Sequence, residues 1–143
     1  AIGLNQFKRL NQLKKIRSKN KNLIINGLKK SDFWNNQFSF FNNNKFLEPS
    51  WFGLPLLINK RFLSKKDKYL KYLKKNKIET RPIISGNFLN QKCIKNFKLQ
   101  NFYKKLPNTE IVSKNGFFIG IPNKSINNKF LEFLTIKLLK YLR

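Results

Sequence analysis

Few side chains in this sequence are suited to catalysis or metal binding. Histidine is absent, cysteine occurs once, as Cys93, and Asp and Glu together number 6 among 143 residues. The lack of histidine excludes His-dependent acid–base catalysis and, with one cysteine, leaves almost no ligands for zinc or haem. Nearby lysines could lower the pKa of Cys93, but no histidine is present to activate its thiol. We therefore predict no catalytic residue and no metal site.

The abundant chemical group is the basic side chain. Lys and Arg number 31, which gives a formal net charge of +25 at pH 7 and an isoelectric point near 10.5. So much like charge on a small domain repels itself, and a polyanionic partner would neutralise it. An AT-rich coding sequence is the alternative explanation for the many Lys, Asn, Ile and Phe residues, although it accounts poorly for the scarcity of Asp and Glu. The charge therefore favours a nucleic-acid partner.

The elements that would carry these groups alternate between helices and strands. Apolar residues at three-and-four spacing predict a long helix over 4–30. Further helices are predicted over 64–76, from Pro107 to just before Gly116, and over 125–142, with strands over 51–58, 78–84 and 117–121. This order predicts an α/β fold of the α+β kind. It would be a two-layer small domain with a short sheet of about three strands, helices on one face, and a long N-terminal helix.

Composition divides this single domain into three parts. Residues 1–32 are the basic amphipathic helix, residues 33–48 an aromatic- and Asn-rich loop, and residues 49–143 the small α/β domain. The loop has two interpretations: its aromatic side chains stack on unpaired bases or pack on a neighbouring protein, or they cap the domain's own core. No uncharged apolar run approaches the ~18 residues of a membrane span.

Three segments occur in an order and at a spacing typical of one enzyme family. They are EPSWFGLPLLI (48–58), IETRPIISGNFLNQ (78–91) and LPNTEIVSKNGFFIG (106–120). They resemble the C-terminal part of the DegT-type, pyridoxal-phosphate-dependent sugar aminotransferases and dehydratases. The opening segment AIGLNQFKRLNQLKKIR (1–17) resembles the helix that joins this family's large cofactor domain to its small domain. The resemblance therefore spans nearly the whole chain.

The resemblance implies the family's small domain without its cofactor site. In the family, the Schiff-base lysine and the acid that pairs with the pyridine nitrogen lie in the large domain, and no lysine here lies in a matching motif. Four positions match segments that reach the family's substrate cleft: Arg81, Asn87, Phe117 and Gly120. Each also has a purely structural explanation, at a strand end, a turn or a close contact. The departures from the family pattern, Lys92 for a usual proline and Ile121-Pro122 for a usual polar residue, favour the structural explanation.

Charge and ancestry together predict a non-catalytic structural protein that binds RNA in a large ribonucleoprotein, the mitochondrial ribosome. Its partners would be ribosomal RNA and neighbouring ribosomal proteins, and it would carry no cofactor. Solvated helix faces are the alternative for the basic residues predicted to contact phosphates. These residues are Lys8, Arg9, Lys14, Lys15, Arg17, Lys65, Lys66, Lys74 and Lys75. The alternative function is the C-terminal half of a split pyridoxal-phosphate-dependent sugar aminotransferase or dehydratase, with Arg81 and Asn87 facing a sugar nucleotide.

Overall fold

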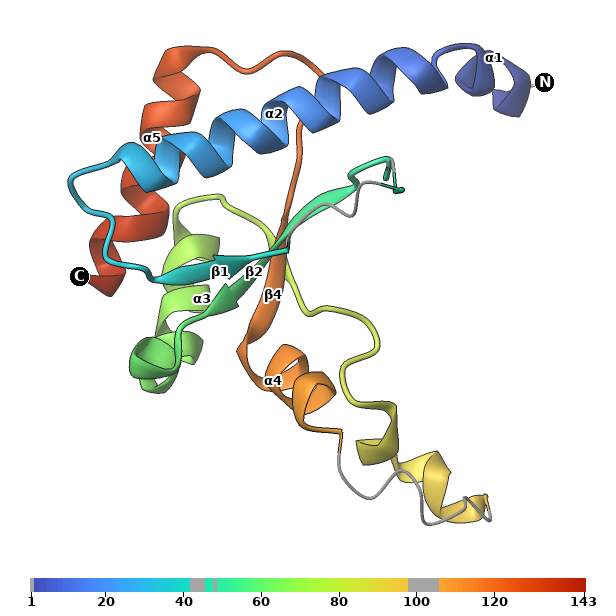
Figure 1. The fold of residues 1–143 in the computed structure, drawn as a ribbon, viewed down its shortest axis with the longest axis vertical. Helices are drawn as coiled ribbons and strands as arrows, with labels where there is room; N and C mark the ends of the chain where they lie inside the picture. The colour runs from blue at the N-terminus through green and yellow to red at the C-terminus, as the bar shows by residue number, and fades with distance from the viewer. Residues whose placement is uncertain (1, 42–45, 48, 98–105) are drawn as a thin grey trace.

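The N-terminal part of the chain is helical, as its apolar spacing predicts. In the computed structural model, which describes residues 2–41, 46–47, 49–97 and 106–143, helix α1 spans Ile2–Lys8 and helix α2 spans Leu10–Lys30 (Figure 1). Arg9 separates the two helices, so the predicted single helix is interrupted there. None of the described helices, α2 included, combines the length and apolar character needed to cross a membrane.

Four short strands form an antiparallel sheet in the order β1–β2–β4–β3. They are β1 (Phe38–Phe40), β2 (Gly53–Ile58), β3 (Thr80–Arg81) and β4 (Gly116–Gly120). The sequence predicts about three strands. The additional strand, β1, lies within the predicted loop 33–48, of which residues 42–45 and 48 are outside the described part. The many Asn residues around β1 favour a loop in a sequence-based prediction. In the structure Phe38 is buried and Ser39 is exposed, which is the alternation of a half-buried strand.

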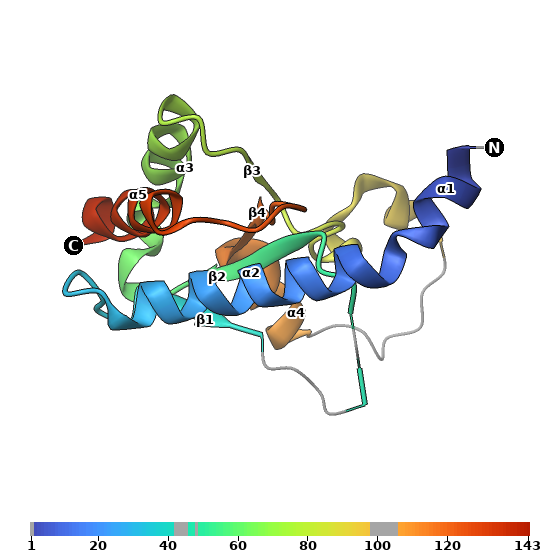
Figure 2. The same cartoon turned by 90° about the horizontal axis from the view of Figure 1, so that it is seen from above.

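Three helices cover the same face of this sheet, which confirms the predicted two-layer arrangement (Figure 2). They are α2, α3 (Lys66–Lys75) and α5 (Asn128–Leu139), and α5 is continued by the short helix η5 (Lys140–Leu142). The facing positions of the central strands are Leu54 opposite Ile119 and Leu56 opposite Phe117. Apolar side chains of the three helices pack on these strands and form one core: Ile24, Leu28, Leu73, Leu134 and Leu138.

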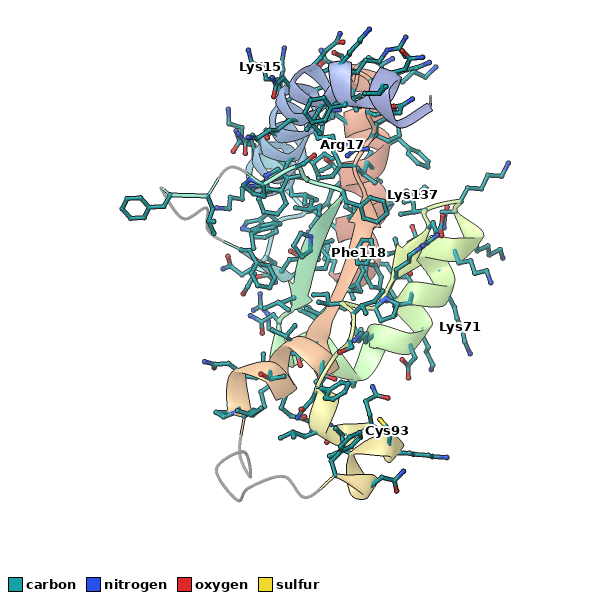
Figure 3. The ribbon with its side chains drawn as sticks, turned by 90° about the vertical axis from the view of Figure 1, so that its right-hand side faces the viewer. Lys15, Arg17, Lys71, Cys93, Phe118 and Lys137 are labelled. Carbon is teal, nitrogen blue, oxygen red and sulfur yellow. The ribbon has the colours of Figure 1, made fainter. Side chains whose placement is uncertain are left out.

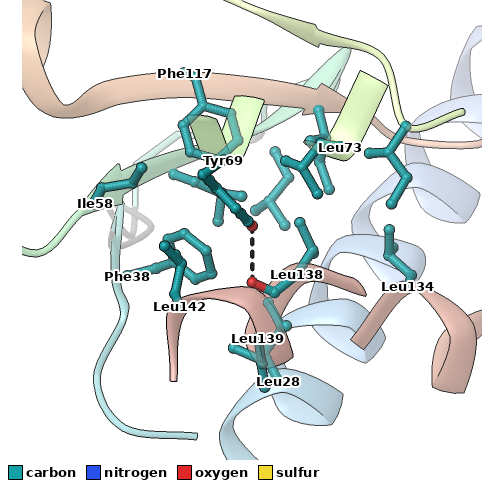
Figure 4. Packing of buried hydrophobic residues seen from close by; sticks show 14 of the residues in the cluster. Leu28, Phe38, Ile58, Tyr69, Leu73, Phe117, Leu134, Leu138, Leu139 and Leu142 are labelled. Carbon is teal, nitrogen blue, oxygen red and sulfur yellow. Dashed lines mark hydrogen bonds between the residues drawn. The ribbon is translucent and has the colours of Figure 1, made fainter. Parts of the chain in front are cut away.

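Tyr69 of α3 lies at the centre of the core (Figure 4). Its ring centroid is 6.2 Å from that of Phe38, 6.1 Å from that of Phe117 and 5.8 Å from that of Tyr141. Its hydroxyl donates a hydrogen bond of 2.8 Å to the carbonyl oxygen of Leu138. Burial raises the pKa of the Tyr69 phenol well above its usual value, so the group stays a neutral donor.

Helix α3 begins differently from the sequence prediction. The Ser64–Asp67 spacing predicts a capping box, but a 3₁₀ helix, η1 (Lys60–Lys65), occupies this stretch and leads directly into α3. The capping side chain lies further back, because Asn59 Oδ1 accepts a 3.2 Å hydrogen bond from the Arg61 backbone N–H. The residue before α3, Lys65, makes no side-chain cap. The local sequence pattern therefore predicts helix α3 correctly but places its first residue and its cap wrongly.

The helices η2 (Phe88–Asn90), η3 (Lys92–Asn96) and α4 (Pro107–Asn115) lie beyond one end of the sheet (Figure 1). Helix α4 begins at Pro107 and ends before Gly116, as predicted. Gly116 has φ −81°, so this glycine is not there for a left-handed turn. A Cβ at this position would collide with the backbone oxygen of Val112, which explains the glycine.

Candidate ligand-binding cleft

A cleft of about 470 Å³ opens beside β3 and the end of β4. Phe52 and Phe118 line it with ring centroids 5.9 Å apart. Phe130 and Phe133 of α5 line it as well and are 39% and 43% exposed, although the helix pattern predicts that both point into the core. The buried residues of α5 are Leu134, Thr135, Leu138 and Leu139, nearer its C-terminal end. The cleft is therefore walled by phenyl rings, which is typical of pockets for organic ligands.

Basic side chains share this cleft with the phenyl rings. Arg17, Lys77 and Arg81 line it, against the one lining carboxylate, Glu79. Glu79 is already engaged, because its Oε1 accepts hydrogen bonds from Arg81 Nη2 at 2.8 Å and from Arg81 Nε at 3.0 Å. Positive charge between apolar walls attracts anions more strongly than it would on an open surface. The arrangement suits a ligand with both a flat or apolar part and an anionic part.

Arg17 reaches the cleft because of its position on α2 (Figure 3). The buried residues of this helix are Asn20, Lys21, Ile24 and Leu28, and Arg17 lies on the same side, one turn earlier. Its Nε atom is buried and has no hydrogen-bond partner in the described part of the chain. Arg17 is among the residues predicted to contact phosphates, and in the structure it continues the buried stripe of α2. The i, i+3, i+7 spacing from Arg17 to Asn20 and Ile24 could have indicated this.

Asn20 fixes the wall of the cleft next to Arg17. Its Nδ2 donates hydrogen bonds to the carbonyl oxygens of Pro122, at 2.9 Å, and Lys124, at 2.8 Å. Asn20 is 1% exposed, so these bonds are shielded from water. The loop that follows β4 is thereby tied to α2, and Pro122 is held at the cleft.

Replacing Asn20 with alanine is expected to lower the free energy of unfolding by about 2 kcal/mol, because the buried Asn20 amide no longer donates to the carbonyl oxygens of Pro122 and Lys124. Urea unfolding followed by circular dichroism measures the change. Asn22→Ala, at an exposed position of the same helix, is the matched control and should change stability little. Equal losses in the two variants would show that the Asn20 hydrogen bonds contribute nothing.

Of the four positions that match segments of the family's substrate cleft, two line the cleft in this structure and two do not. Arg81 and Gly120 line the cleft. Phe117 is 1% exposed and belongs to the core. Asn87 caps η2, with its Oδ1 accepting from Leu89 N at 3.1 Å, and its Nδ2 donates to Glu110 Oε2 at 2.9 Å. Phe118 lies in the FFIG segment that matches the family's cleft, whereas Phe52, Phe130, Phe133 and Lys77 are not predicted as cleft residues, and the i, i+3 pair Phe130 and Phe133 is the local pattern that could have pointed there.

Glu110 joins η2 to α4, and its contribution should depend on pH. Its carboxylate accepts hydrogen bonds from Asn87 and, at 3.2 Å, from Asn90, and lies 3.1 Å from Lys114 Nζ. These donors lower the pKa of Glu110 below its usual value of 4.5, with Asn87 the largest cause. A lowered folded-state pKa stabilises the fold above 4.5, and this contribution is lost as the pH falls through the folded value.

We therefore expect the junction of η2 and α4 to loosen in acid. Hydrogen exchange of the Asn87–Asn90 amides, measured from pH 7 downward, should show less protection below 4.5 after correction for intrinsic rates. Glu110→Gln should remove this pH dependence. A wild-type profile identical to that of Glu110→Gln would show that the carboxylate does not hold the junction.

The predicted phosphate-contacting residues have different surroundings. Lys66 is turned inward, and its ammonium donates to the carbonyl oxygens of Lys114 and, at 3.1 Å, Gly116. Burial lowers the pKa of Lys66 from its usual value. Lys14 and Arg17 are half-buried. The exposed members of the set are Lys8, Arg9, Lys15, Lys65, Lys74 and Lys75.

Comparison with known proteins identifies the ancestry of this fold. The sequence profile of the DegT/DnrJ/EryC1/StrS aminotransferase family matches residues 1–128. The chain belongs to this family. The DegT-family resemblance inferred from the three segments and the opening helix is thus confirmed, as is the small-domain fold.

Two curated DegT-family relatives are GDP-4-keto-6-deoxy-D-mannose 3-dehydratases. The Escherichia coli O55:H7 enzyme is 29% identical over 120 residues, which cover 84% of this chain and 29% of the enzyme. The Yersinia pseudotuberculosis enzyme is 28% identical over 127 residues, again 84% of this chain and 29% of the enzyme. The chain therefore spans about three tenths of the length of these relatives.

Solved DegT-family structures show the same fold. The E. coli GDP-4-keto-6-deoxy-D-mannose-3-dehydratase, solved with bound hydrated PLP, matches with a TM-score of 0.80 and 28% identity over 96% of this chain and 33% of that one. A GDP-4-keto-6-deoxymannose-3-dehydratase mutant with bound GDP-perosamine matches with a TM-score of 0.79 over 96% of this chain and 34% of that one. The relatives are enzymes that act on a nucleotide-linked sugar.

These relatives correct the function predicted from charge. The prediction of a ribosomal, RNA-binding protein is wrong, because the homologous proteins are pyridoxal-phosphate-dependent sugar dehydratases and none of them is a ribosomal protein. The mitochondrial location was inferred from the ribosome and loses its basis with it. The error came from treating net charge as a sum: a total of +25 does not say how far each cation is exposed, and Lys66 and Arg17 are half-buried.

The cleft does not fit pyridoxal phosphate as a resident cofactor. The ring nitrogen of pyridoxal needs an acid partner, and the one carboxylate lining the cleft, Glu79, is paired with Arg81. Lys66 donates to two carbonyl oxygens, and Lys21 lies 4.1 Å from the centroid of the Trp51 ring. These two are the lysines whose pKa burial lowers in the described residues, and neither lines the cleft.

Proposed function

We propose that this chain is the small domain of a pyridoxal-phosphate-dependent enzyme that acts on a GDP-linked 4-keto-6-deoxy sugar. One observation carries the proposal: a cleft of about 470 Å³, walled by phenyl rings and basic side chains, lies in a fold that matches GDP-4-keto-6-deoxy-D-mannose-3-dehydratase over 96% of the chain. The cleft would receive part of the nucleotide sugar, while a large domain supplies the cofactor. The proposal agrees with the alternative function predicted from the sequence, the C-terminal half of a split enzyme. It also allows the large domain to lie on the same chain.

Different lining residues would contact different parts of the nucleotide sugar. Phe52 and Phe118 offer ring surfaces against which a guanine base or a sugar ring can pack. Arg17 and Lys77 would supply positive charge for the diphosphate, and Glu79 Oε1 orients the Arg81 guanidinium by accepting hydrogen bonds from its Nε and Nη2. Gly120 keeps the cleft open, because no atom lies within 4 Å of where its Cβ would be.

The roles of this chain in the reaction are binding and orientation. Pyridoxal phosphate, when bound in the large domain, supplies the electron sink for chemistry on the sugar. We expect no turnover by this chain by itself, because in the family the cofactor lysine and its acid partner belong to the large domain. By binding the nucleotide on one side, this domain would orient the sugar toward the cofactor in the large domain. Part of the binding energy would then serve to hold the sugar in position for reaction.

Chemical-shift mapping with GDP-mannose tests the proposal. We expect GDP-mannose to shift the backbone amides of Phe118 and Gly120, and free mannose to leave them unchanged. Gly120→Leu, which fills open space in the cleft, should weaken the effect without unfolding the chain. Ile2 to Lys8 provide an internal control, because α1 lines no part of the cleft. Shifts confined to other surfaces, or none at Phe118 and Gly120, would contradict the proposed function.

A further inference from the structure

An apolar stripe is exposed near the N-terminal end of the chain. It consists of Leu4 and Phe7 of α1 and Leu10 of α2, which follow one another at three-residue spacing and are 72%, 73% and 43% exposed. Figure 1 and Figure 2 both place α1 beyond the end of the sheet. Three large apolar side chains on one exposed helical segment are typical of an interaction surface.

This N-terminal stripe prolongs the side of α2 that packs on the domain's own core. Leu10, Leu13 and Arg17 are spaced by three and four residues, so they share one side of the helix. The same spacing leads on to Asn20 and Ile24, which are buried. Leu13 is half-buried and Leu10 exposed, so the side stays apolar where the domain beneath it ends. Because Arg17 lines the cleft, a body packed on Leu10 would lie about two helical turns from the cleft.

The border of the N-terminal stripe is basic. Residues 1–31 contain no Asp or Glu. The exposed cations of this segment include Lys8, Arg9 and Lys15. A second copy of this chain is a poor occupant, because it would bring the same cations face to face. A partner with an apolar centre and carboxylates around it would bury the stripe and balance the charge, as interfaces commonly do.

We propose that the N-terminal stripe docks on the cofactor-bearing domain of the enzyme, and that this domain presents carboxylates to Lys8, Arg9 and Lys15. The inference rests on the proposed function, which requires such a domain. The fold of this chain corresponds to 33% of the E. coli dehydratase solved with PLP, so the larger part of that enzyme lies outside it. Docking on the stripe gives the excess positive charge of this chain an acidic protein surface as its partner.

Photo-cross-linking from position 7 tests the docking. p-Benzoylphenylalanine replaces Phe7 in the cells that make the protein, and borohydride reduction after illumination fixes pyridoxal phosphate on the lysine that holds it. We expect the linked peptide to come from a domain that carries phosphopyridoxyl-lysine, on the same or another polypeptide. Gln6 lies on a different side of α1 and is the matched control position, which should give little linked product.

The cross-link has three outcomes that would overturn the proposal. One is a link from position 7 to residues 1–143 of the same chain or of a second copy. Another is a link to RNA or to a protein without phosphopyridoxyl-lysine, or no link. The third is an equal yield of linked product from positions 6 and 7, because the stripe would then have no preference for the partner.

Carbodiimide coupling tests the carboxylates separately. This reagent condenses an ammonium with a carboxylate in contact with it, so Lys8 and Lys15 should form amide bonds with Asp or Glu of the cofactor-bearing domain. Lys19 is exposed on the opposite side of α2 from Leu10 and is the matched control. Equal coupling at Lys19, or none at Lys8 and Lys15, would overturn the acidic border of the partner.

Urea unfolding separates docking from a role inside this chain. Phe7→Gln should unfold at the same urea concentration as wild type, because Phe7 is exposed, and should lose the carbodiimide coupling of Lys8. A clear loss of stability would show that the stripe packs within the chain itself and would overturn the proposal.

The GDP-mannose experiment distinguishes failure of this inference from failure of the proposed function. If GDP-mannose shifts Phe118 and Gly120 while position 7 links to no pyridoxal-carrying domain, the proposed function stands and the docking is overturned. If position 7 links to such a domain while GDP-mannose leaves the cleft unchanged, the docking stands and the proposed ligand is wrong.

Discussion

Replacing Tyr69 with alanine is expected to lower the free energy of unfolding by about 3–5 kcal/mol, a large part of the total stability of a small domain. Tyr69 is fully buried and lies against the rings of Phe38, Phe117 and Tyr141. Alanine would leave a cavity among these rings, since they come from different strands and helices and cannot all move inward together. The variant should unfold at a much lower urea concentration.

Tyr69→Phe separates the hydroxyl from the ring. Leu138 lies one residue before the end of α5, and its carbonyl oxygen accepts the Tyr69 hydroxyl at 2.8 Å. Removing the hydroxyl should cost about 1–2 kcal/mol while the ring contacts remain. A loss in Tyr69→Phe as large as that in Tyr69→Ala would mean that the hydrogen bond, rather than ring packing, stabilises the core.

Replacing Gly116 with alanine is expected to cost about 2–3 kcal/mol, because it overpacks a junction that cannot give way. The new Cβ would meet the Val112 backbone oxygen, with Ile83 Cδ1 at 2.7 Å. The isoleucine could rotate, but the Val112 oxygen is fixed, because it accepts the Gly116 N–H at the end of α4. Relief would require moving α4 relative to β4.

Gly120→Ala is the matched control for this prediction. Gly120 lies in the same strand, and its Cβ would meet nothing within 4 Å. We expect this variant to be neutral or more stable by up to about 1 kcal/mol, because alanine has fewer unfolded conformations. Thermal or urea unfolding of both variants provides the comparison. Equal stability of Gly116→Ala and wild type would show that the α4–β4 junction is more compliant than its contacts indicate.

The parts of the fold that were predicted from sequence depend on the local spacing of apolar residues and on the residues that begin and end helices. Apolar spacing identified the helix later seen as α2, and Pro107 with Gly116 marked both ends of α4. Strand β1 and the true start of α3 were not predicted. Strand β1 depends on a partner distant in sequence, because Phe38 pairs with Ile58. The start of α3 depends on a local cap that lies further upstream, because Asn59 caps the 3₁₀ helix that occupies the expected start.

The cleft was predicted only in part, through the family resemblance at Arg81 and Gly120. Phe130 and Phe133 were expected in the core because α5 is apolar on nearly all sides, so periodicity cannot say which side other elements cover. Arg17 is among the residues predicted to contact phosphates from charge, and charge does not show that its side chain is half-buried. Its burial follows from the packing of α2 along the sheet and α5, which composition does not encode.

The sequence by itself determined the family, the alternation of helices and strands, and the lack of histidine-based chemistry, because these follow from residue identity and short-range spacing. Only the tertiary structure decided which charged side chains are buried, hydrogen bonded or paired. It turned Lys66 toward two carbonyl oxygens, paired Glu79 with Arg81, and buried the Nε of Arg17 without an acceptor among the described residues. The physical reason is that an electrostatic contribution depends on burial and on the nearest partner, and both are set by residues far apart in the chain.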